Sequence, residues 1–272
     1  NKIKIMLNEP KKNFKIVSDP RARVILPNTL TLIGVCIGLT SINFALNQNY
    51  KLSIIAILLA AIIDGLDGRI ARLIKGTSKV GKELDSLTDV ISFGVAPAFI
   101  MYFWQLNTLG KIGWLISLIY VVCVALRLAR FNINAGGEPS WRDNFFEGVP
   151  SPAGGILVLS PLIYEVSGLD IISLNYNIIT PIIFIIVSIL LISKMPTYSF
   201  KKIVVPRSTT IFLLFGIVLL FGLLLIFPFK ALALGCVVYL IMIPLSGVHY
   251  LKLKKNLKNN KNYQEEEPED VL

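Results

Sequence analysis

The sequence predicts an all-α integral membrane protein with about eight transmembrane helices. Two observations support this class. Hydrophobic residues make up 54% of the 272-residue chain, and the mean hydropathy of +0.68 is too high for an ordinary soluble domain. The apolar runs also reach the length that a helix needs to cross a bilayer.

The expected spans follow one another with short connections. We place them at residues 29–47, 53–74, 86–104, 112–131, 152–168, 177–193, 210–227 and 231–249. The fifth is the weakest of these, because it is short and contains Glu165.

The placement of Lys and Arg predicts that both termini are cytoplasmic. Of the 27 basic residues, 24 lie in the termini and in connections that would share one side of the membrane. We expect a basic amphipathic interfacial segment over 1–26, a transmembrane domain over 27–250 and a charged, disordered tail over 251–272. The net charge of +10 therefore suits a membrane surface, and no basic platform for nucleic acid is present.

The stretch from Asp64 to Asp89 carries the clearest chemical pattern. Four aspartates stand at or just beyond the ends of two apolar segments, where an unpaired charge is costly. At about 100° per residue, helical spacing gathers them with small residues on two faces. The first face carries Asp64, Asp67, Gly68, Ala71 and Arg72, and the second carries Gly81, Asp85 and Asp89. Two neighbouring helices can thus direct four carboxylates toward one point.

Clustered carboxylates repel one another unless a cation neutralises them. Hard oxygen ligands without His or Cys suit Mg²⁺, Mn²⁺ or Ca²⁺ rather than zinc. The basic residues around the cluster indicate an anionic ligand such as phosphate. They are Arg69, Arg72, Lys75, Lys79 and Lys82. A charged cytoplasmic loop at the membrane surface would explain the basic residues, but it would not explain Asp64, which follows a long apolar run.

This pattern resembles the full signature of the CDP-alcohol phosphatidyltransferases, membrane enzymes that move a phosphatidyl group from a CDP-linked lipid to an alcohol. All its specified positions match: Asp64, Asp67, Gly68, Ala71, Arg72, Gly81, Asp85 and Asp89. The resemblance implies that Asp64, Asp67 and Asp85 bind a divalent metal, Mg or Mn. It also implies that Asp89 is the general base and can touch the metal. Gly68, Ala71, Arg72 and Gly81 would then adjoin the CDP group.

Asn28 and Thr31 open the first expected span after Pro27. One interpretation is a helix start, with Asn28 as the cap and Thr31 bonding backward. The family resemblance implies a second role for both, in holding CDP. The two roles are compatible, because a helix N-terminus offers free N–H groups to phosphate.

Arg127 and Arg130 end the fourth span in Arg-Leu-Ala-Arg-Phe-Asn, and Ser151 follows in Gly-x-Pro-Ser-Pro-Ala. Both arginines could be cations that reach the membrane surface, or they could form an anion site for the acceptor or the lipid phosphate. Together these motifs resemble the integral-membrane phosphatidylserine synthases within the family. The residues themselves exclude no other small alcohol.

The resemblance therefore implies transfer of the phosphatidyl group of CDP-diacylglycerol to L-serine at the cytoplasmic face, which is the inner membrane if the cell is bacterial. It also implies that the protein forms a homodimer and that membrane lipids surround it. Glycerol 3-phosphate, inositol and inositol phosphate remain alternative acceptors. A prenyltransferase fits less well, because Gly68, Ala71, Arg72 and Gly81 match the signature. A cation transporter is the alternative from another class, but transport sites usually lie near the bilayer midplane.

Overall fold

The structure, a computed structural model, describes residues 20–74, 76–134, 145–169, 175–198 and 207–259. These residues are almost entirely helical, with one two-stranded sheet. Residues 1–19 and 260–272, which hold most of the expected interfacial segment and tail, lie outside the described ranges.

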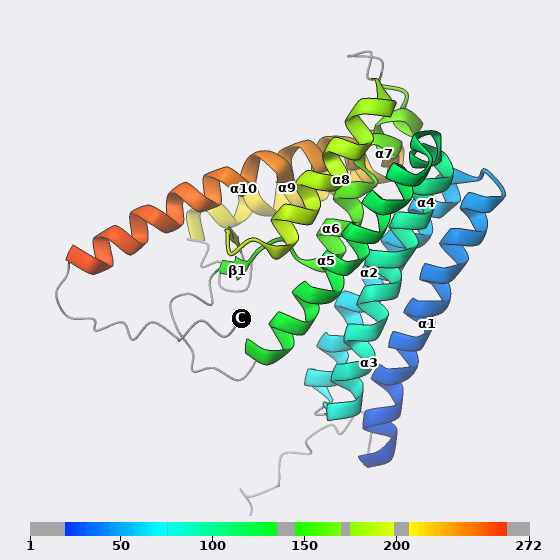
Figure 1. The fold of residues 1–272 in the computed structure, drawn as a ribbon. Coiled ribbons are helices and arrows are strands. Elements are labelled where there is room, and N and C mark those ends of the chain that lie inside the picture. Colours follow the sequence, from blue (N-terminus) through cyan, green and yellow to red (C-terminus); the bar gives the residue numbers. More distant parts are fainter. Residues whose placement is uncertain (1–19, 75, 135–144, 170–174, 199–206, 260–272) are drawn as a thin grey trace, which may run out of the picture.

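The first half of the chain forms a group of helices that run side by side (Figure 1). They are α1 (Pro20–Leu46), α2 (Tyr50–Leu73), α3 (Lys79–Asp89), the π-helical turn η1 (Val90–Val95), α4 (Ala96–Trp104), the 3₁₀ turn η2 (Leu106–Leu109) and α5 (Lys111–Asn134). Polar caps begin two of them. Asn49 Oδ1 accepts from the Leu52 N–H at 3.4 Å, and Ser78 Oγ accepts from the Gly81 N–H at 2.9 Å.

The second half adds shorter helices and a long final one, which leans away from the first group (Figure 1). Its elements are β1 (Phe145–Glu147), α6 (Ser151–Val158), α7 (Ser160–Ser167), α8 (Tyr176–Ile192), β2 (Pro196–Tyr198), α9 (Arg207–Ile226) and α10 (Pro228–Asn259). Here α8 packs on α5, and α10 packs on α7 and β2.

An all-α membrane architecture is confirmed, whereas the number of crossings stays a prediction. Four stretches of helix among the described residues are long and apolar enough to cross a bilayer: Arg23–Leu46, Lys79–Trp104, Lys111–Ile133 and Pro228–Tyr250. The helix α2 is equally long but carries the aspartates, and α8 is an apolar helix of 17 residues.

The fifth expected span, over 152–168, is two short helices in the structure rather than one. The break falls at Leu159, between α6 and α7. Pro161 has no N–H to bond the carbonyl of Leu157, and the residue before a proline disfavours helical geometry. The local sequence therefore interrupts the helix.

The third span also departs from a regular helix. The π-helical turn η1 separates α3 from α4, and Pro97 follows it. Pro97 cannot donate to the carbonyl of Phe93 four residues earlier. The hydroxyl of Tyr120 on α5 donates to that carbonyl instead, at 2.7 Å, and both side chains are fully buried. This hydrogen bond fixes the turn that follows Asp89.

Helix α1 begins earlier than expected, so Asn28 is not a helix cap. Pro27 and Asn28 lie inside α1, which starts at Pro20. The carbonyl of Arg23 loses its bond to Pro27, and Gly76 packs closely against that oxygen, where any side chain would collide with it. The expected backward bond of Thr31 is confirmed: its Oγ1 donates to the Pro27 carbonyl at 3.1 Å.

The small sheet joins three distant parts of the chain. The strands β1 and β2 are antiparallel, with Phe146 opposite Thr197. Thr197 Oγ1 donates to the carbonyl of Gly148 at 2.8 Å, and Ser246 of α10 donates to the carbonyl of Pro196 at 2.6 Å. Gly148 has a φ of +72° and lies against carbonyl oxygens, so only glycine suits this turn. The network fixes the chain just before α6.

Candidate active site

Three carboxylates meet where the end of α2 lies beside α3. One oxygen each from Asp64, Asp67 and Asp85 lies within 4.8 Å of the others. The two aspartates of α2 are three residues apart, so they share a face, and Asp85 faces them from one turn before the end of α3. The structure thus brings together the three residues that the sequence predicted as metal ligands.

Asp67 is held by α1. Its side chain is 3% exposed, and its Oδ2 accepts from the Thr31 hydroxyl at 2.5 Å. Its Oδ1 is buried and has no hydrogen-bond partner among the described residues. Burying a carboxylate oxygen without a partner costs free energy, so we expect a cation or a hydrogen-bond donor to bind this atom.

Asp89, the last residue of α3, is partly buried beside Asp64. It interacts with Asp64 within hydrogen-bonding reach, and two carboxylates so close need a proton or a cation between them. Its Oδ1 is also buried without a partner among the described residues. Asp89 does not belong to the group whose oxygens lie within 4.8 Å, so it adjoins the expected metal site from one side.

The donor set fits a hard divalent cation. The ligand atoms are carboxylate oxygens only, and the cluster contains no His or Cys. The unpartnered Oδ1 of Asp67 gives such an ion a direct contact. Mg²⁺ and Mn²⁺ suit these ligands equally well.

The residues expected near CDP come from three helices around the same end of the bundle. A Cβ at Gly81 of α3 would lie 2.8 Å from Oδ1 of Asn28 on α1, so these helices approach closely there. In contrast, nothing lies within 4 Å of a Cβ built at Gly68 of α2. Ala71 and Arg72 follow one turn later, and Arg72 is exposed. Gly68 therefore borders open space beside the carboxylates, which is what a nucleotide would require.

The sequence motifs around Arg127 and Ser151 meet in space. Arg127 Nη1 of α5 donates to Ser151 Oγ, the first residue of α6, at 2.5 Å. Arg127 is only 8% exposed, and its charge attracts that of Asp89. Its Nε–H has no partner among the described residues. A cationic donor thus stands beside the expected general base.

Arg130 is used differently from Arg127. It donates to the carbonyls of Ile192, at 2.9 Å, and Ser193, at 3.4 Å. These carbonyls end α8, where cationic side chains are favourable. In the structure Arg130 joins the site end of α5 to α8.

Sequence reasoning missed two neighbours of the site. Tyr239 of α10 interacts electrostatically with Arg127. Asn132 donates to Ser86 Oγ at 2.8 Å, and the Asn132 carbonyl accepts from Lys82 at 3.4 Å, so the end of α5 is tied to α3. No spacing rule relates residues on separate helices, although Asn132 belongs to the motif that begins at Arg127.

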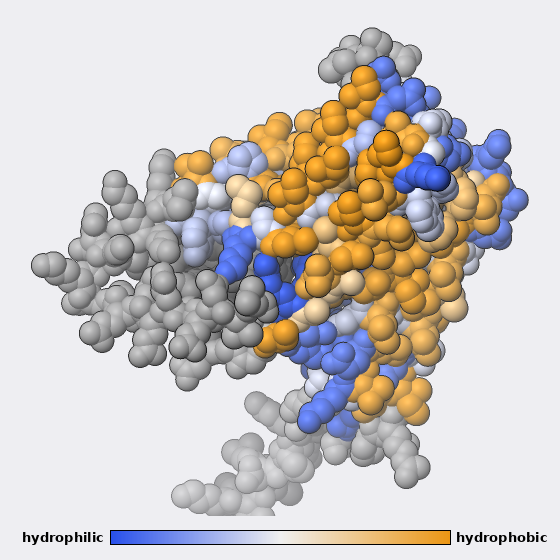
Figure 2. Space-filling model, in the orientation of Figure 1, coloured by the Kyte–Doolittle hydropathy of each residue, from blue (hydrophilic) through white to orange (hydrophobic). Residues whose placement is uncertain are grey.

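The polar site lies at one end of the bundle, next to flanks that are largely apolar (Figure 2). Figure 2 shows hydrophilic side chains gathered around the lower ends of the upright helices and below α8, whereas the flanks above are hydrophobic. This arrangement defines a class of protein: a helical membrane protein with a carboxylate cluster that could hold a metal ion, and a buried arginine, at one end of the bundle.

Comparison with known proteins gives the family. A family model described as CDP-alcohol phosphatidyltransferase matches residues 24–190. The chain therefore belongs to the CDP-alcohol phosphatidyltransferase family, and the resemblance seen in its sequence is confirmed. The four aspartates, Arg127, Arg130 and Ser151 lie inside the matched region, whereas Tyr239 lies beyond it.

Several curated relatives are similar to parts of this chain. The CDP-diacylglycerol–serine O-phosphatidyltransferase of Mycobacterium leprae is 47% identical over 154 residues, which are 54% of this chain and 51% of that protein. The protein of the same name from Bacillus subtilis is 34% identical over 181 residues, 65% of this chain and 92% of its own. The archaetidylserine synthase of Methanothermobacter thermautotrophicus is 35% identical over 142 residues, 50% of this chain and 57% of its own. The chain spans about half the length of the mycobacterial relatives that it matches.

Proposed function

We propose that this protein transfers the phosphatidyl group of CDP-diacylglycerol to the hydroxyl of L-serine, which yields phosphatidylserine and CMP. The observation that carries the proposal is the meeting of Asp64, Asp67 and Asp85 beside Asp89 and Arg127 at one end of the bundle. The names of the similar proteins from Mycobacterium leprae and Bacillus subtilis support serine as the acceptor.

The three clustered carboxylates would hold the divalent cation, Mg²⁺ or Mn²⁺, and Asp89 would adjoin them through its contact with Asp64. When bound, such a cation neutralises charge on pyrophosphate oxygens and on the departing CMP. Thr31 would orient Asp67 by donating to its Oδ2, which leaves the buried Oδ1 available to the cation. The open space at Gly68 would receive the nucleotide, beside Asn28, Ala71, Arg72 and Gly81.

Asp89 would act as the general base. It accepts the proton of the serine hydroxyl as that oxygen attacks the lipid-side phosphorus. A bond forms between the serine oxygen and this phosphorus, and the bond from the phosphorus to the oxygen of CMP breaks. CMP leaves with the electron pair. The unpartnered, buried Oδ1 of Asp89 is an acceptor for this proton.

Arg127 supports the reaction in two ways. Its charge favours the ionised form of Asp89, in opposition to burial and to the neighbouring carboxylates of Asp64 and Asp85. Its Nε–H, which is buried and without a described partner, can donate to the serine carboxylate. Ser151 holds the guanidinium in place for both tasks. Arg130 would act at a distance, by fixing the end of α8.

The site would open to the cytoplasm, with both termini on that side. This orientation rests on the excess of Lys and Arg at this membrane face. In a bacterial cell the protein would lie in the inner membrane. The apolar runs of the sequence further favour eight crossings, and the family resemblance favours a homodimer.

The decisive experiment measures CMP release from CDP-diacylglycerol by the purified protein. Serine, glycerol 3-phosphate and inositol are offered separately, with Mg²⁺ or Mn²⁺. Serine-dependent release with formation of phosphatidylserine is expected. Release with another acceptor alone would overturn the serine assignment, and no release with any acceptor would overturn the transferase function.

Replacing Asp89 with Asn tests the general base. Asp89→Asn should lower kcat by roughly 10²–10⁴-fold, because the amide cannot accept the hydroxyl proton. Glu83→Gln is the matched control, since Glu83 is an exposed carboxylate on the same helix. Equal kcat values for Asp89→Asn and the unaltered protein would exclude Asp89 as the base.

Removal of divalent metal provides an independent test. A chelator should abolish serine-dependent CMP release, and added Mg²⁺ or Mn²⁺ should restore it, because the carboxylate cluster repels an anionic pyrophosphate without a cation. Full activity in excess chelator would contradict the metal site.

A further inference from the structure

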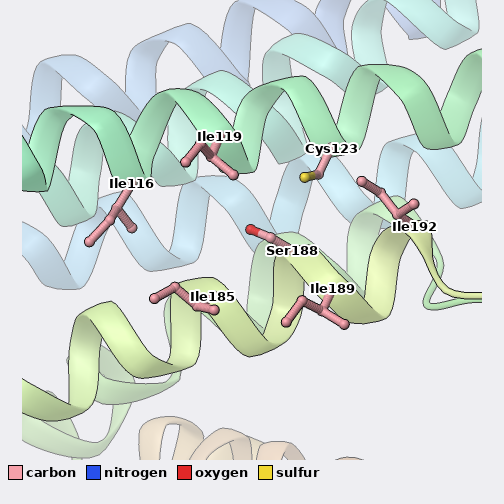
Figure 3. Close-up of a pocket in the computed structure, with 7 residues that line it drawn as sticks. All are labelled: Ile116, Ile119, Cys123, Ile185, Ser188, Ile189 and Ile192. Atoms are coloured by element: carbon pink, nitrogen blue, oxygen red, sulfur yellow. The ribbon is translucent and has the colours of Figure 1, made fainter.

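A groove of about 240 Å³ lies between α5 and α8 on the apolar flank of the bundle. Figure 3 shows its two walls, which come from facing sides of these helices. Ile116, Ile119 and Cys123 line it from α5, and Ile185, Ser188, Ile189 and Ile192 line it from α8. The groove is distinct from the carboxylate cluster, and no residue assigned to the site lines it.

The groove exists because two small side chains face each other between large ones. Cys123 and Ser188 point toward one another and form the floor, at 6% and 5% exposure (Figure 3). The rims are isoleucines, such as Ile119 and Ile189, which are exposed and stiff at χ1. The Ser188 hydroxyl donates to the Phe184 carbonyl at 2.7 Å, so the floor offers no free donor from this serine. The lining is therefore effectively apolar.

One face of α5 leads from this groove to the site. Ile116, Ile119 and Cys123 are spaced three and four residues apart, and Arg127 and Arg130 continue the same spacing. The face is apolar for about two turns and then cationic. Ile192 lines the groove at its other wall, and its carbonyl accepts the hydrogen bond from Arg130. The groove therefore ends beside the arginines of the active-site end.

The apolar stretch of α5 followed by two arginines is complementary to a phospholipid, in which an apolar acyl chain is linked to an anionic phosphate. We propose that the α5–α8 groove binds one acyl chain of the CDP-linked diacylglycerol, while its pyrophosphate lies at the site end. The inference rests on the proposed function and specifies how that site holds its lipid substrate.

A lipid chain fits this groove better than a protein helix does. Helices pack closely in membranes through small residues at their surfaces, whereas the rims here are exposed isoleucines. A flexible chain can enter between such rims and reach the small side chains on the floor. Ile116 stands about 16 Å from Arg127 along the helix, so only a long acyl chain whose phosphate lies near Arg127 reaches the far end of the groove.

The test compares dipalmitoyl and dioctanoyl CDP-glycerol as substrates of variants that fill the end of the groove far from Arg127. Ile116→Trp fills it from α5, and Ile185→Trp fills it from α8. The matched controls are Leu115→Trp and Ile186→Trp, which place the same side chain at exposed neighbours outside the groove. The full-length protein is used in detergent micelles, with serine as the acceptor.

Both groove variants should raise KM for the dipalmitoyl substrate by about tenfold or more and leave KM for the dioctanoyl substrate within about twofold. Both controls should leave the ratio of the two KM values unchanged. Retained dioctanoyl turnover shows that a variant is folded. If a Trp variant loses turnover of both substrates, Ile116→Phe and Ile185→Phe are measured in the same way.

An unchanged KM ratio in both groove variants, or an equal change in the controls, would overturn the acyl-chain assignment and indicate that the groove is filled by bulk lipid only. Such a result would leave the transferase function intact. Absence of turnover by the unaltered protein with every acceptor would instead reject the proposed function, and this inference with it.

Discussion

At the scale of single residues, Thr31 links two roles that are usually assigned separately. Its hydroxyl bonds the Pro27 carbonyl of its own helix and also Oδ2 of Asp67 on α2. The second bond holds Oδ2 and restricts the rotation of the carboxylate, whereas Oδ1 is buried without a partner among the described residues. Residues that orient a ligand in this way influence metal affinity although they do not touch the metal.

Thr31→Val should therefore weaken metal activation. We expect the concentration of Mg²⁺ that gives half-maximal activity to rise by roughly 10–100-fold, because Asp67 loses its only described side-chain donor. The rise in unfolding temperature on adding Mg²⁺ should shrink in parallel, and it provides a readout that does not depend on turnover.

Thr29→Val is the control for this prediction. Thr29 is an exposed threonine of α1 whose hydroxyl bonds only the Ile25 carbonyl among the described residues, at 2.9 Å. The Thr29→Val variant should need the same Mg²⁺ concentration for half-maximal activity as the unaltered protein. Identical metal activation of Thr31→Val and Thr29→Val would show that Thr31 does not orient the cluster.

At the scale of elements, the π-helical turn η1 determines where Asp89 points. The turn follows Asp89 directly, and it is held from two sides. The Tyr120 hydroxyl satisfies the Phe93 carbonyl, and Gly155 of α6 lies so close that a Cβ there would come 3.2 Å from the Phe93 Cα. Helices α5 and α6 thus support the residue that we propose as the base.

Tyr120→Phe should destabilise the protein by about 1–3 kcal/mol, because the Phe93 carbonyl would be left without a partner in the apolar interior. The measurement is denaturant unfolding in detergent, followed by circular dichroism. Tyr102→Phe removes a hydroxyl from a partly buried tyrosine whose ring packs on Trp114, and it should change stability by less than about 0.5 kcal/mol. Equal stability of both variants would contradict the structural role of the Tyr120 bond.

At the scale of the whole molecule, the two ends of the helix group differ in chemistry. Basic residues and the carboxylate cluster gather at one end, and only Lys51, Lys111 and Lys230 fall outside the expected cytoplasmic regions. Two of these, Lys51 and Lys111, lie at the starts of α2 and α5, which both run toward the site. The asymmetry predicts orientation through the preference of basic residues for the cytoplasm.

Reporter fusions in a bacterial host test this orientation. Alkaline phosphatase is active only outside the cytoplasm, so fusions after Asn49 and Gly110 should be active, and fusions after Gly76 and Asn134 should be inactive. Both pairs lie between helices or at a helix end. Activity after Gly76 together with inactivity after Asn49 would reverse the proposed topology and place the site on the opposite face.

Much of the candidate site could be predicted from the order of the amino acids. Asp64 and Asp67 share a face of α2 as expected, because helical geometry alone sets which side chains of one helix share a face. Thr31 bonds Pro27 for the same reason. Asp85 meets the two aspartates because α1 packs against both α2 and α3. The prediction of Asn28 as a helix cap was wrong, since α1 continues past Pro27 to Pro20, with Gly76 packed closely on the Arg23 carbonyl.

Hydropathy and helical periodicity were sufficient to predict the membrane class, the order of the apolar segments and the residues on each carboxylate face. Both are local properties, set by residues within a few helical turns of one another. Three features depend instead on the packed fold: Arg127 meets Ser151, Tyr120 bonds Phe93, and α5 and α8 enclose a groove. These contacts follow from which helix faces pack together. Side-chain volumes and helix breaks along the whole chain set that packing, and no local pattern encodes it.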